Sequence, residues 1–259
     1  MQKDGKYVYC VIESSYDSYF GDLGIGDESM PVTTIGYEDI CMVVSDHPIN
    51  NLEVNSENIL SHQHVIEKVM QEYDSVLPIR FGTIATNADE IRNLLQRRYR
   101  ELKDLLYNYR HMFEINIKCC WRNIETIFQE INNEYPNIFT KCKQIEQNTL
   151  VDKSSLEDKM AHTGELVTKA LKEKKRQEQK TILNAFKAIS FNYKHNIIVE
   201  DNMIMNTAFL INSGREREID HILCDLDFQF HDRMDIFLTS PLPIFNFIDL
   251  KILPEQWEL

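Results

Sequence analysis

The sequence predicts an α+β protein with two domains. Residues 1–110 would form an N-terminal α+β domain with a small sheet and two helices, and residues 111–259 a C-terminal ferredoxin-like (split β-α-β) domain with an extra long helix. Three observations predict this class. Segments in which apolar residues recur at every second position adjoin segments in which they recur at helical spacing. The composition is globular, with 43% hydrophobic and 27% charged residues, and the predicted elements of the second half have the order β-α-(long α)-β-β-α-β.

The net charge restricts the expected partners. Lys and Arg number 28 and Asp and Glu number 41, which gives −13. So acidic a chain is repelled by nucleic acid and by anionic membranes, and no apolar run approaches the roughly 20 residues that span a bilayer. The start, Met1–Lys6, holds no apolar signal region. We therefore expect a cytoplasmic protein with neither nucleic acid nor membrane as partner.

Residues that carry catalysis or bind metals do not occur here at the required spacings. The six cysteines include no C-x-x-C pair, and most fall among predicted strand residues, which favours buried reduced thiols. His62 and His64 lie two apart rather than four, so surface or partly buried histidines are expected rather than a metal site. No Walker loop, H-E-x-x-H or G-x-S-x-G motif is present. We expect no catalytic residue, no metal and no cofactor.

The first domain is predicted to be arranged around one buried strand. Tyr7–Ile12 is apolar on both alternating sets, as in a central strand covered on both faces. Thr33–Ile35 and Ile40–Val44 flank a polar turn and indicate a β-hairpin. A helix is expected to follow, with Ser56 as its N-cap and an apolar stripe that continues to Tyr73.

Val76–Ile84 is the most informative stretch of this domain. An apolar run between breakers predicts a short buried strand that carries Arg80 at its end, and Gly82 permits a sharp turn. Arg80 either binds a nearby carboxylate or helix-end carbonyls, the commoner situation, or belongs to an anion or partner site. A capping-box-like start at Asn87 then opens one helix of about five turns that continues to Tyr109.

The second domain begins with strict alternation from Phe113 to Trp121, which predicts a strand. A helix follows and stops at Pro136, and Ser154–Glu157 is a capping box for a long helix whose polar middle, residues 172–180, is expected to project into solvent. Further strands are expected over residues 189–193, 204–211 and 228–238, with a charged helix from residue 214. Pro241–Ile248 is either a strap over the core or an exposed docking segment.

Several segments together resemble the gas vesicle protein F/L family (GvpF and GvpL), in the right order and over nearly the whole chain. The most specific is Val76-Leu77-Pro78-Ile79-Arg80-Phe81-Gly82-Thr83. The others are Tyr7–Tyr9, Ile40–Asp46, His64–Met70, Glu114–Lys118 and Thr239–Phe247. The family's ending usually has Gly before the first Pro, Trp after it and Tyr further on, where this chain has Ser240, Leu242 and Phe245.

The resemblance implies a two-domain accessory or minor structural protein of gas vesicles, without catalytic residues. It implies that the partners are the small hydrophobic shell protein and other accessory proteins, met during nucleation or assembly. Burial of apolar area stabilises such contacts, so the hairpin, the turn after Arg80 and the C-terminal aromatic segment are the expected surfaces. The partner-binding residues would be Tyr37, Arg80, Phe81, Thr83, Phe245 and Phe247.

The alternative function is a small-molecule-binding sensor or an enzyme, because ferredoxin-like domains carry many unrelated functions. A deep pocket that holds titratable groups with perturbed pKa would favour that alternative. The sequence leaves open whether the chain is closer to F or to L.

Overall fold

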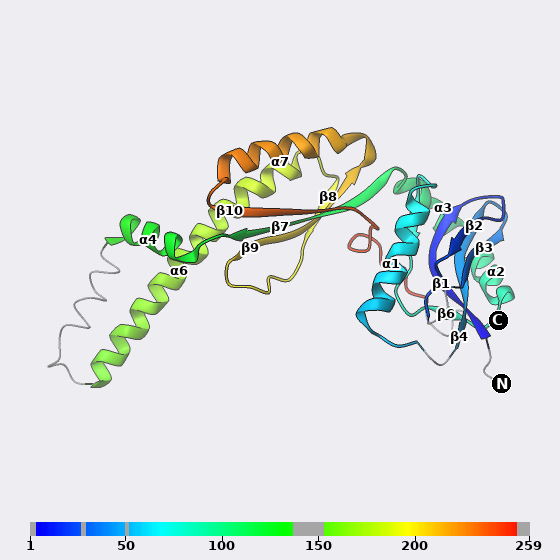
Figure 1. Cartoon of the computed structure of the whole chain (residues 1–259), viewed down its shortest axis with the longest axis horizontal. Coiled ribbons are helices and arrows are strands. Elements are labelled where there is room, and N and C mark those ends of the chain that lie inside the picture. Colours follow the sequence, from blue (N-terminus) through cyan, green and yellow to red (C-terminus); the bar gives the residue numbers. More distant parts are fainter. Residues whose placement is uncertain (1–3, 27–29, 50–51, 137–152, 253–259) are drawn as a thin grey trace. The chain divides into compact units, whose positions relative to one another are not determined.

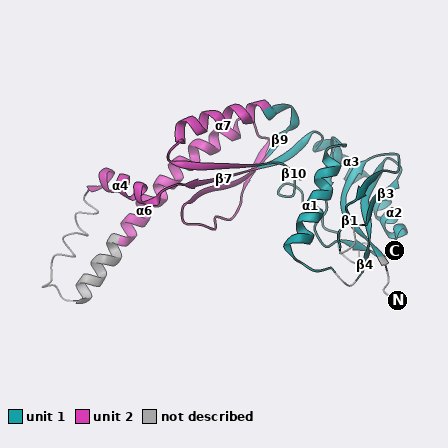
Figure 2. Ribbon diagram, in the orientation of Figure 1, with its two compact units in different colours: residues 1–115, 210–216, 239–259 teal, residues 116–209, 217–238 magenta. Residues whose placement is uncertain are grey.

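The structure is a computed structural model that describes residues 4–26, 30–49, 52–136 and 153–252 (Figure 1). The chain forms two compact units (Figure 2): unit 1 is Met1–Ile115, Leu210–Glu216 and Thr239–Leu259, and unit 2 is Asn116–Phe209 and Arg217–Leu238. Each unit has both helices and strands, so the predicted α+β class is confirmed. The domain boundary at residue 110 stays a prediction, and the described residues 239–252 belong to unit 1 rather than to unit 2, which precedes them in the sequence.

Unit 1 contains an antiparallel sheet with the strand order β2-β3-β4-β1-β5, and β6 also pairs with β1. Its strands are β1 (Asp4–Glu13), β2 (Tyr19–Asp22), β3 (Pro31–Tyr37), β4 (Ile40–Pro48), β5 (Val76–Pro78) and β6 (Ile84–Ala85). Residues 7–12 of β1 are fully buried. The predicted central strand and the β3–β4 hairpin are therefore confirmed.

Helices cover both faces of this sheet (Figure 1). Helix α1 (Ser56–Met70) packs on the face that carries Tyr7 and Tyr9, and α2 (Ala88–Arg97) and α3 (Tyr99–Asn108) pack on the face that carries Val8 and Val11. The α1 N-cap is Asn55, whose side chain accepts from the backbone N–H of Asn58 at 2.8 Å, and not the predicted Ser56.

The single five-turn helix predicted from Asn87 is wrong, although Asn87 does cap α2. The backbone leaves the helical conformation at Arg98, with φ −100° and ψ 14°, and α3 begins at the next residue. Leu94 and Leu102, on either side of the break, are both buried in the same core. Helical apolar spacing continues across the break, so periodicity does not reveal it.

The second sheet has the strand order β10-β7-β9-β8. Its strands are β7 (Met112–Trp121), β8 (Asn192–His195), β9 (Met203–Asn212) and β10 (Met234–Leu242), and the associated helices are α4 (Ile124–Glu134), α6 (Lys153–Lys187) and α7 (Glu216–Phe230). With β7 counted as the first strand, this is the order 4-1-3-2 of the ferredoxin-like fold. The predicted connection over residues 137–152, and the side chains of the capping box from Ser154, lie outside the described part of the chain.

Two predicted strand positions in the second half are wrong. The strand predicted over 189–193 begins three residues later, and the one predicted from Phe228 begins at Met234 because α7 continues to Phe230. Phe228 is 91% exposed while Phe230 is buried, since two residues along a helix face different directions. Their spacing of two resembles that of a strand.

The prediction that the polar middle of α6 projects into solvent holds for part of it, because Lys172, Arg176, Gln177 and Lys180 are exposed. The side chains of Lys174 and Glu178 are only 15% and 12% exposed. Lys174 pairs with Glu130 and Glu134 of α4, and Glu178 accepts from Arg233 and from the indole N–H of Trp121. Lys174 and Glu178 are partly buried because each meets an opposite charge or a donor.

The prediction of buried reduced cysteines holds for four of the five described ones, which are Cys10, Cys41, Cys119 and Cys120. Burial raises the pKa of Cys41 to about 11, which keeps its thiol protonated. Cys224 is the exception and lies exposed on α7.

Candidate partner-binding site

His62 of α1 occupies the centre of the candidate site and joins three segments of unit 1. Its Nε2 lies 3.1 Å from the carbonyl oxygen of Ile79, and its Nδ1 lies 2.9 Å from the hydroxyl of Tyr7 in β1. A carbonyl oxygen can only accept, so the hydrogen is on Nε2, and Nδ1 accepts from Tyr7. The Tyr7 hydroxyl in turn accepts from the backbone N–H of Gly82 at 3.1 Å.

This network requires His62 to be uncharged. Burial lowers the pKa of His62 to about 4, and burial also raises the pKa of Tyr7. Protonation of Nδ1 would place a second donor against the Tyr7 hydroxyl, which already accepts from Gly82 and would lose its own acceptor. At neutral pH the two side chains therefore form a fixed, neutral pair of hydrogen-bonding groups.

Aromatic rings surround His62 and come from both ends of the chain. Tyr9 stacks on the imidazole at 5.6 Å between ring centroids, and Phe81 approaches edge-on at 5.7 Å. Phe245, from the C-terminal segment, lies 6.0 Å from the same ring and is 39% exposed. Two predicted partner-binding residues that are far apart in the sequence thus contact one histidine.

Arg80 lies beside this cluster and binds a carboxylate, as the commoner interpretation of the sequence predicts. Its guanidinium donates to Asp249 at 2.9 Å, and the two side chains are 61% and 55% exposed. Ile79 forms a parallel bridge with Leu250, which holds the C-terminal segment against this turn. The hydroxyl of Thr83 donates to the carbonyl oxygen of Arg80 at 2.7 Å, so Thr83 closes the turn.

The other two predicted residues, Tyr37 and Phe247, lie against the core on the α2–α3 side. Tyr37 contacts Tyr99 edge-on at 6.0 Å between ring centroids, and both it and Phe247 are partly buried there. The carbonyl oxygen of Phe247 accepts from the hydroxyl of Tyr109 at 3.5 Å. The structure thus brings Arg80, Phe81, Thr83 and Phe245 together, and the partner-binding role of all six residues stays a prediction.

His62 is 2% exposed, so the expectation of a surface or partly buried histidine is wrong for this residue. A signal for it exists in the helix. His62 falls three residues after Ile59 and four before Ile66, which places it on the apolar stripe of α1. The segment 241–248 combines both interpretations considered for it, because Ile244 and Ile248 are buried while Phe245 faces solvent.

Apolar side chains continue from His62 toward the start of α1. Ile59, one turn before His62, is 44% exposed, and Leu60 and Val54 are 64% and 80% exposed. We call Ile59, Phe81, Phe245 and the neighbouring Arg80 the α1 surface. It combines accessible apolar groups with one cation, a composition typical of protein contact sites.

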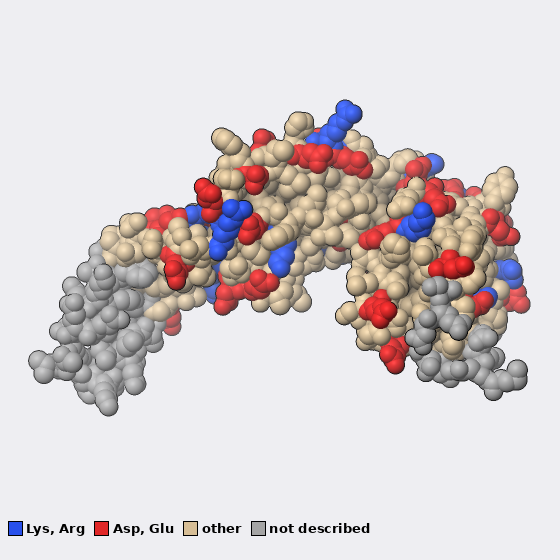
Figure 3. Space-filling view, viewed as in Figure 1, with Lys and Arg blue, Asp and Glu red and all other residues tan. Residues whose placement is uncertain are grey.

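Other kinds of site depend on charged side chains, possible metal ligands and apolar helices among the described residues. Acidic side chains are scattered over the face shown in Figure 3, with fewer basic ones among them. Within the described ranges, no three His, Cys, Asp or Glu side chains are placed to hold a metal ion. None of the helices described there combines the length and the apolar character needed to cross a bilayer.

Comparison with known proteins identifies the family. The family model of gas vesicle synthesis protein GvpL/GvpF matches residues 5–249. Gas vesicle protein F1 of Halobacterium salinarum is 23% identical over 96% of this chain and 95% of its own length, and gas vesicle protein F of Microcystis aeruginosa is 26% identical over 71% and 75%.

Solved structures agree at the level of fold. The crystal structure of the gas vesicle protein GvpF from an Anabaena species has a TM-score of 0.81 at 19% identity, and covers 96% of this chain and 100% of its own. That of GvpF from Microcystis aeruginosa has a TM-score of 0.74 at 21% identity, with coverage of 95% and 99%. Because the family model matches nearly the whole length of this chain, the chain belongs to the gas vesicle synthesis protein GvpL/GvpF family.

Proposed function

We propose that this protein takes part in gas vesicle assembly by binding the hydrophobic shell protein through the α1 surface. Membership of the family gives the role in gas vesicles. The observation that supports this surface is the meeting of two family-like segments, 76–83 and 239–247, at His62, where Phe245 stays accessible and Arg80 adjoins it. Burial of the exposed rings against an apolar subunit would stabilise the contact.

The remaining parts of the proposal follow from the same role. The protein acts in the cytoplasm and on the vesicle, other accessory proteins are further partners, and no chemical reaction is involved. Arg80 contributes specificity for the partner rather than affinity, because an exposed cation mainly favours a partner of complementary charge. Its pairing with Asp249 leaves it accessible for that purpose.

Co-purification of this chain with the shell subunit tests the proposal. The wild-type chain is expected to retain the subunit, Phe245→Ser to lose most of it, and Arg80→Ala to lose part. Phe228→Ser is the matched control, since Phe228 is 91% exposed on α7 in the other unit. Failure of the folded wild-type chain to retain the subunit, or equal loss in both serine variants, would refute the assignment of this surface.

Point variants are preferable to a truncation before Pro241. Such a truncation would also remove Ile244, Ile248 and Leu250, which are buried in the core of unit 1. Loss of binding after truncation would then report loss of the fold and not loss of the contact.

A further inference from the structure

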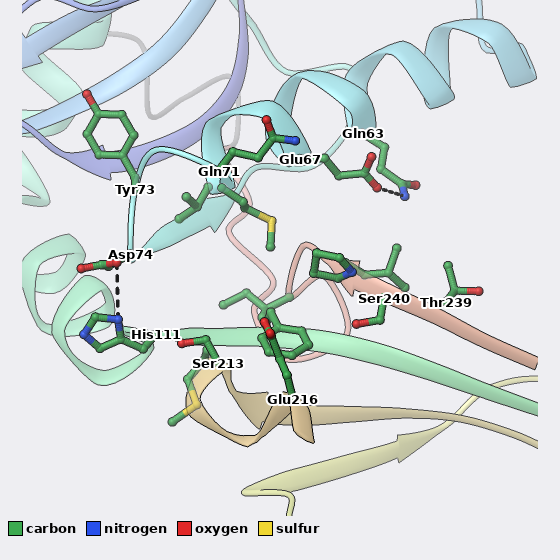
Figure 4. A pocket seen from close by; sticks show the side chains of 17 residues that line it. Gln63, Glu67, Gln71, Tyr73, Asp74, His111, Ser213, Glu216, Thr239 and Ser240 are labelled. Atoms are coloured by element: carbon green, nitrogen blue, oxygen red, sulfur yellow. Dashed lines mark hydrogen bonds and ion pairs between the residues drawn. The ribbon is translucent and has the colours of Figure 1, made fainter. Parts of the chain in front are cut away.

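A pocket of about 420 Å³ opens beside the C-terminal half of α1, and all of its lining residues belong to unit 1 (Figure 4). Gln63 and Glu67 of α1 and Gln71, the residue that caps its C-terminus, form one wall. Ser213, just before α7, and Glu216, its first residue, face them across the opening. This pocket is distinct from the α1 surface, whose residues do not line it.

The apolar part of the lining includes Met70, Val76, Met112, Phe113 and Ile244. Three of these side chains, Val76, Phe113 and Ile244, are buried, whereas Met70 and Met112 are only partly buried. An occupant would therefore bury apolar area against a preformed surface, which is the main source of affinity in such a site.

The charged part of the lining is one-sided. It contains the carboxylates of Glu67, Asp74 and Glu216 and no Lys or Arg. His111 lies 3.5 Å from Asp74, and Glu67 accepts from Gln63 at 2.7 Å through Oε1 alone. Glu216 forms no ion pair within the described parts of the chain. The carboxylates of Glu67 and Glu216 thus retain lone pairs for an external donor.

We propose that this pocket binds a segment of a partner protein in which an Arg or Lys side chain stands next to apolar residues. The apolar lining supplies affinity, and the carboxylates select the cation and repel acidic segments. The complementarity rests on the lining, which has acceptors on both walls and neither Lys nor Arg. The proposal goes beyond the assembly role and does not require the partner to be the shell protein.

Short capped peptides test it on the full chain with ¹³C-methyl-labelled methionines. Met70 and Met112 line the pocket and report its occupancy, whereas the buried Met203 and Met205 of unit 2 are internal controls. Acetyl-Leu-Arg-Leu-amide is expected to shift the first pair only. Its neutral citrulline analogue should bind about three- to tenfold more weakly, because one ion pair with partly exposed carboxylates is lost.

The acetyl-Gly-Arg-Gly-amide peptide separates the apolar from the charged contribution and should bind least well. Equal affinity for the arginine and citrulline peptides would overturn the role of the carboxylates. Equal affinity for the glycine-flanked peptide would overturn the role of the apolar lining. Absence of any response at Met70 and Met112, up to the solubility limit of the peptide, would overturn the site itself.

Charge reversal sharpens the test. Glu67→Lys with Glu216→Lys is expected to abolish binding of the arginine peptide and to create binding of acetyl-Leu-Glu-Leu-amide. Asp220→Lys with Asp225→Lys changes the net charge equally on the exposed face of α7, outside the pocket, and should leave the arginine peptide bound as before. Glu216→Gln provides a milder change, with an expected loss of about threefold. Equal effects of the two double variants would contradict a local site.

Discussion

The two compact units connect their distant segments by different chemistry. In unit 1 an uncharged cluster around His62 joins α1, β1, the turn at 79–82 and the C-terminal segment. In unit 2 an ionic network joins α4 and α6 to the residue before β10, through Arg233 and Lys174 on one side and three glutamates on the other. The hydrogen-bonded side chains of the first network, His62 and Tyr7, are buried, while the charged side chains of the second are partly exposed.

We call the cluster around His62 the unit 1 junction, and the network of Arg233 and Lys174 with Glu130, Glu134 and Glu178 the unit 2 junction. The difference between them shows how burial selects the chemistry that joins distant segments. His62 is 2% exposed, where an ionised imidazole would lose its hydration, so it is kept neutral. Arg233 is 24% exposed, so its charge retains some water and also two carboxylate partners. The hydrogen bond from Arg233 is the largest cause that lowers the pKa of Glu130. Mild acid should therefore weaken the first junction before the second.

Removal of the His62 side chain is the most direct way to break the unit 1 junction. His62→Ala is expected to lower the free energy of unfolding by about 4 kcal/mol, since it leaves a cavity among aromatic rings and removes partners from Tyr7 and Ile79. Urea unfolding of both proteins measures this difference. His64→Ala, at an exposed position of the same helix, should change it by no more than about 0.5 kcal/mol. Similar effects of both variants would show that the cluster adds nothing.

Acid should expose the same contrast through protonation of His62. Its pKa falls from 6.5 to about 4 on folding, so the unfolded chain binds a proton that the folded chain does not. Stability from this residue is therefore complete above pH 6.5 and declines by about 3 kcal/mol as the pH falls to 4. Urea unfolding at several pH values measures the decline. His62→Gln should lack this part of it, and an unchanged pH slope in that variant would contradict the assignment.

The ionic junction of unit 2 should respond less to the loss of one member. Arg233→Met is expected to cost about 2 kcal/mol, because Glu130 and Glu178 lose their shared cation in a partly buried place. Arg122→Met is the control, since Arg122 pairs with Asp235 at a site where both side chains are 43% exposed. Thermal unfolding of the two variants makes the comparison, and equal shifts would mean that partial burial of the network has no effect.

The smallest effect on stability is expected for Arg80→Ala. Arg80 and Asp249 are both more than half exposed, and such ion pairs contribute little in water. The unfolding midpoint should therefore remain unchanged within error, at low and at high salt alike. A marked loss of stability would assign Arg80 to the unit 1 junction, and its effect on retention of the shell subunit would no longer indicate a contact.

Sequence reasoning predicted those features that depend on local patterns. The alternation of apolar and polar residues predicted β7 correctly, and the run of apolar residues predicted the buried strand β1. Both patterns lie within single strands. It missed the break at Arg98 because apolar spacing continues across it. It missed the partners of Lys174 and the place of His62 because both depend on residues far away in the sequence. The resemblance to the GvpF and GvpL family rests on motifs spread over the whole chain rather than on periodicity, and the match of the family model confirms that resemblance.

The C-terminal segment has a consequence for synthesis of the chain. Ile244, Ile248 and Leu250 complete the core that Leu77 and Ile79 begin. A ribosome must therefore translate all of unit 2 before the first unit can finish folding, although domains usually fold in the order in which they emerge. During that interval the nascent chain presents an unfinished apolar face, which is the state that molecular chaperones recognise. Residues 244–250, which are translated after unit 2, therefore decide when the core around Leu77 and Ile79 becomes stable.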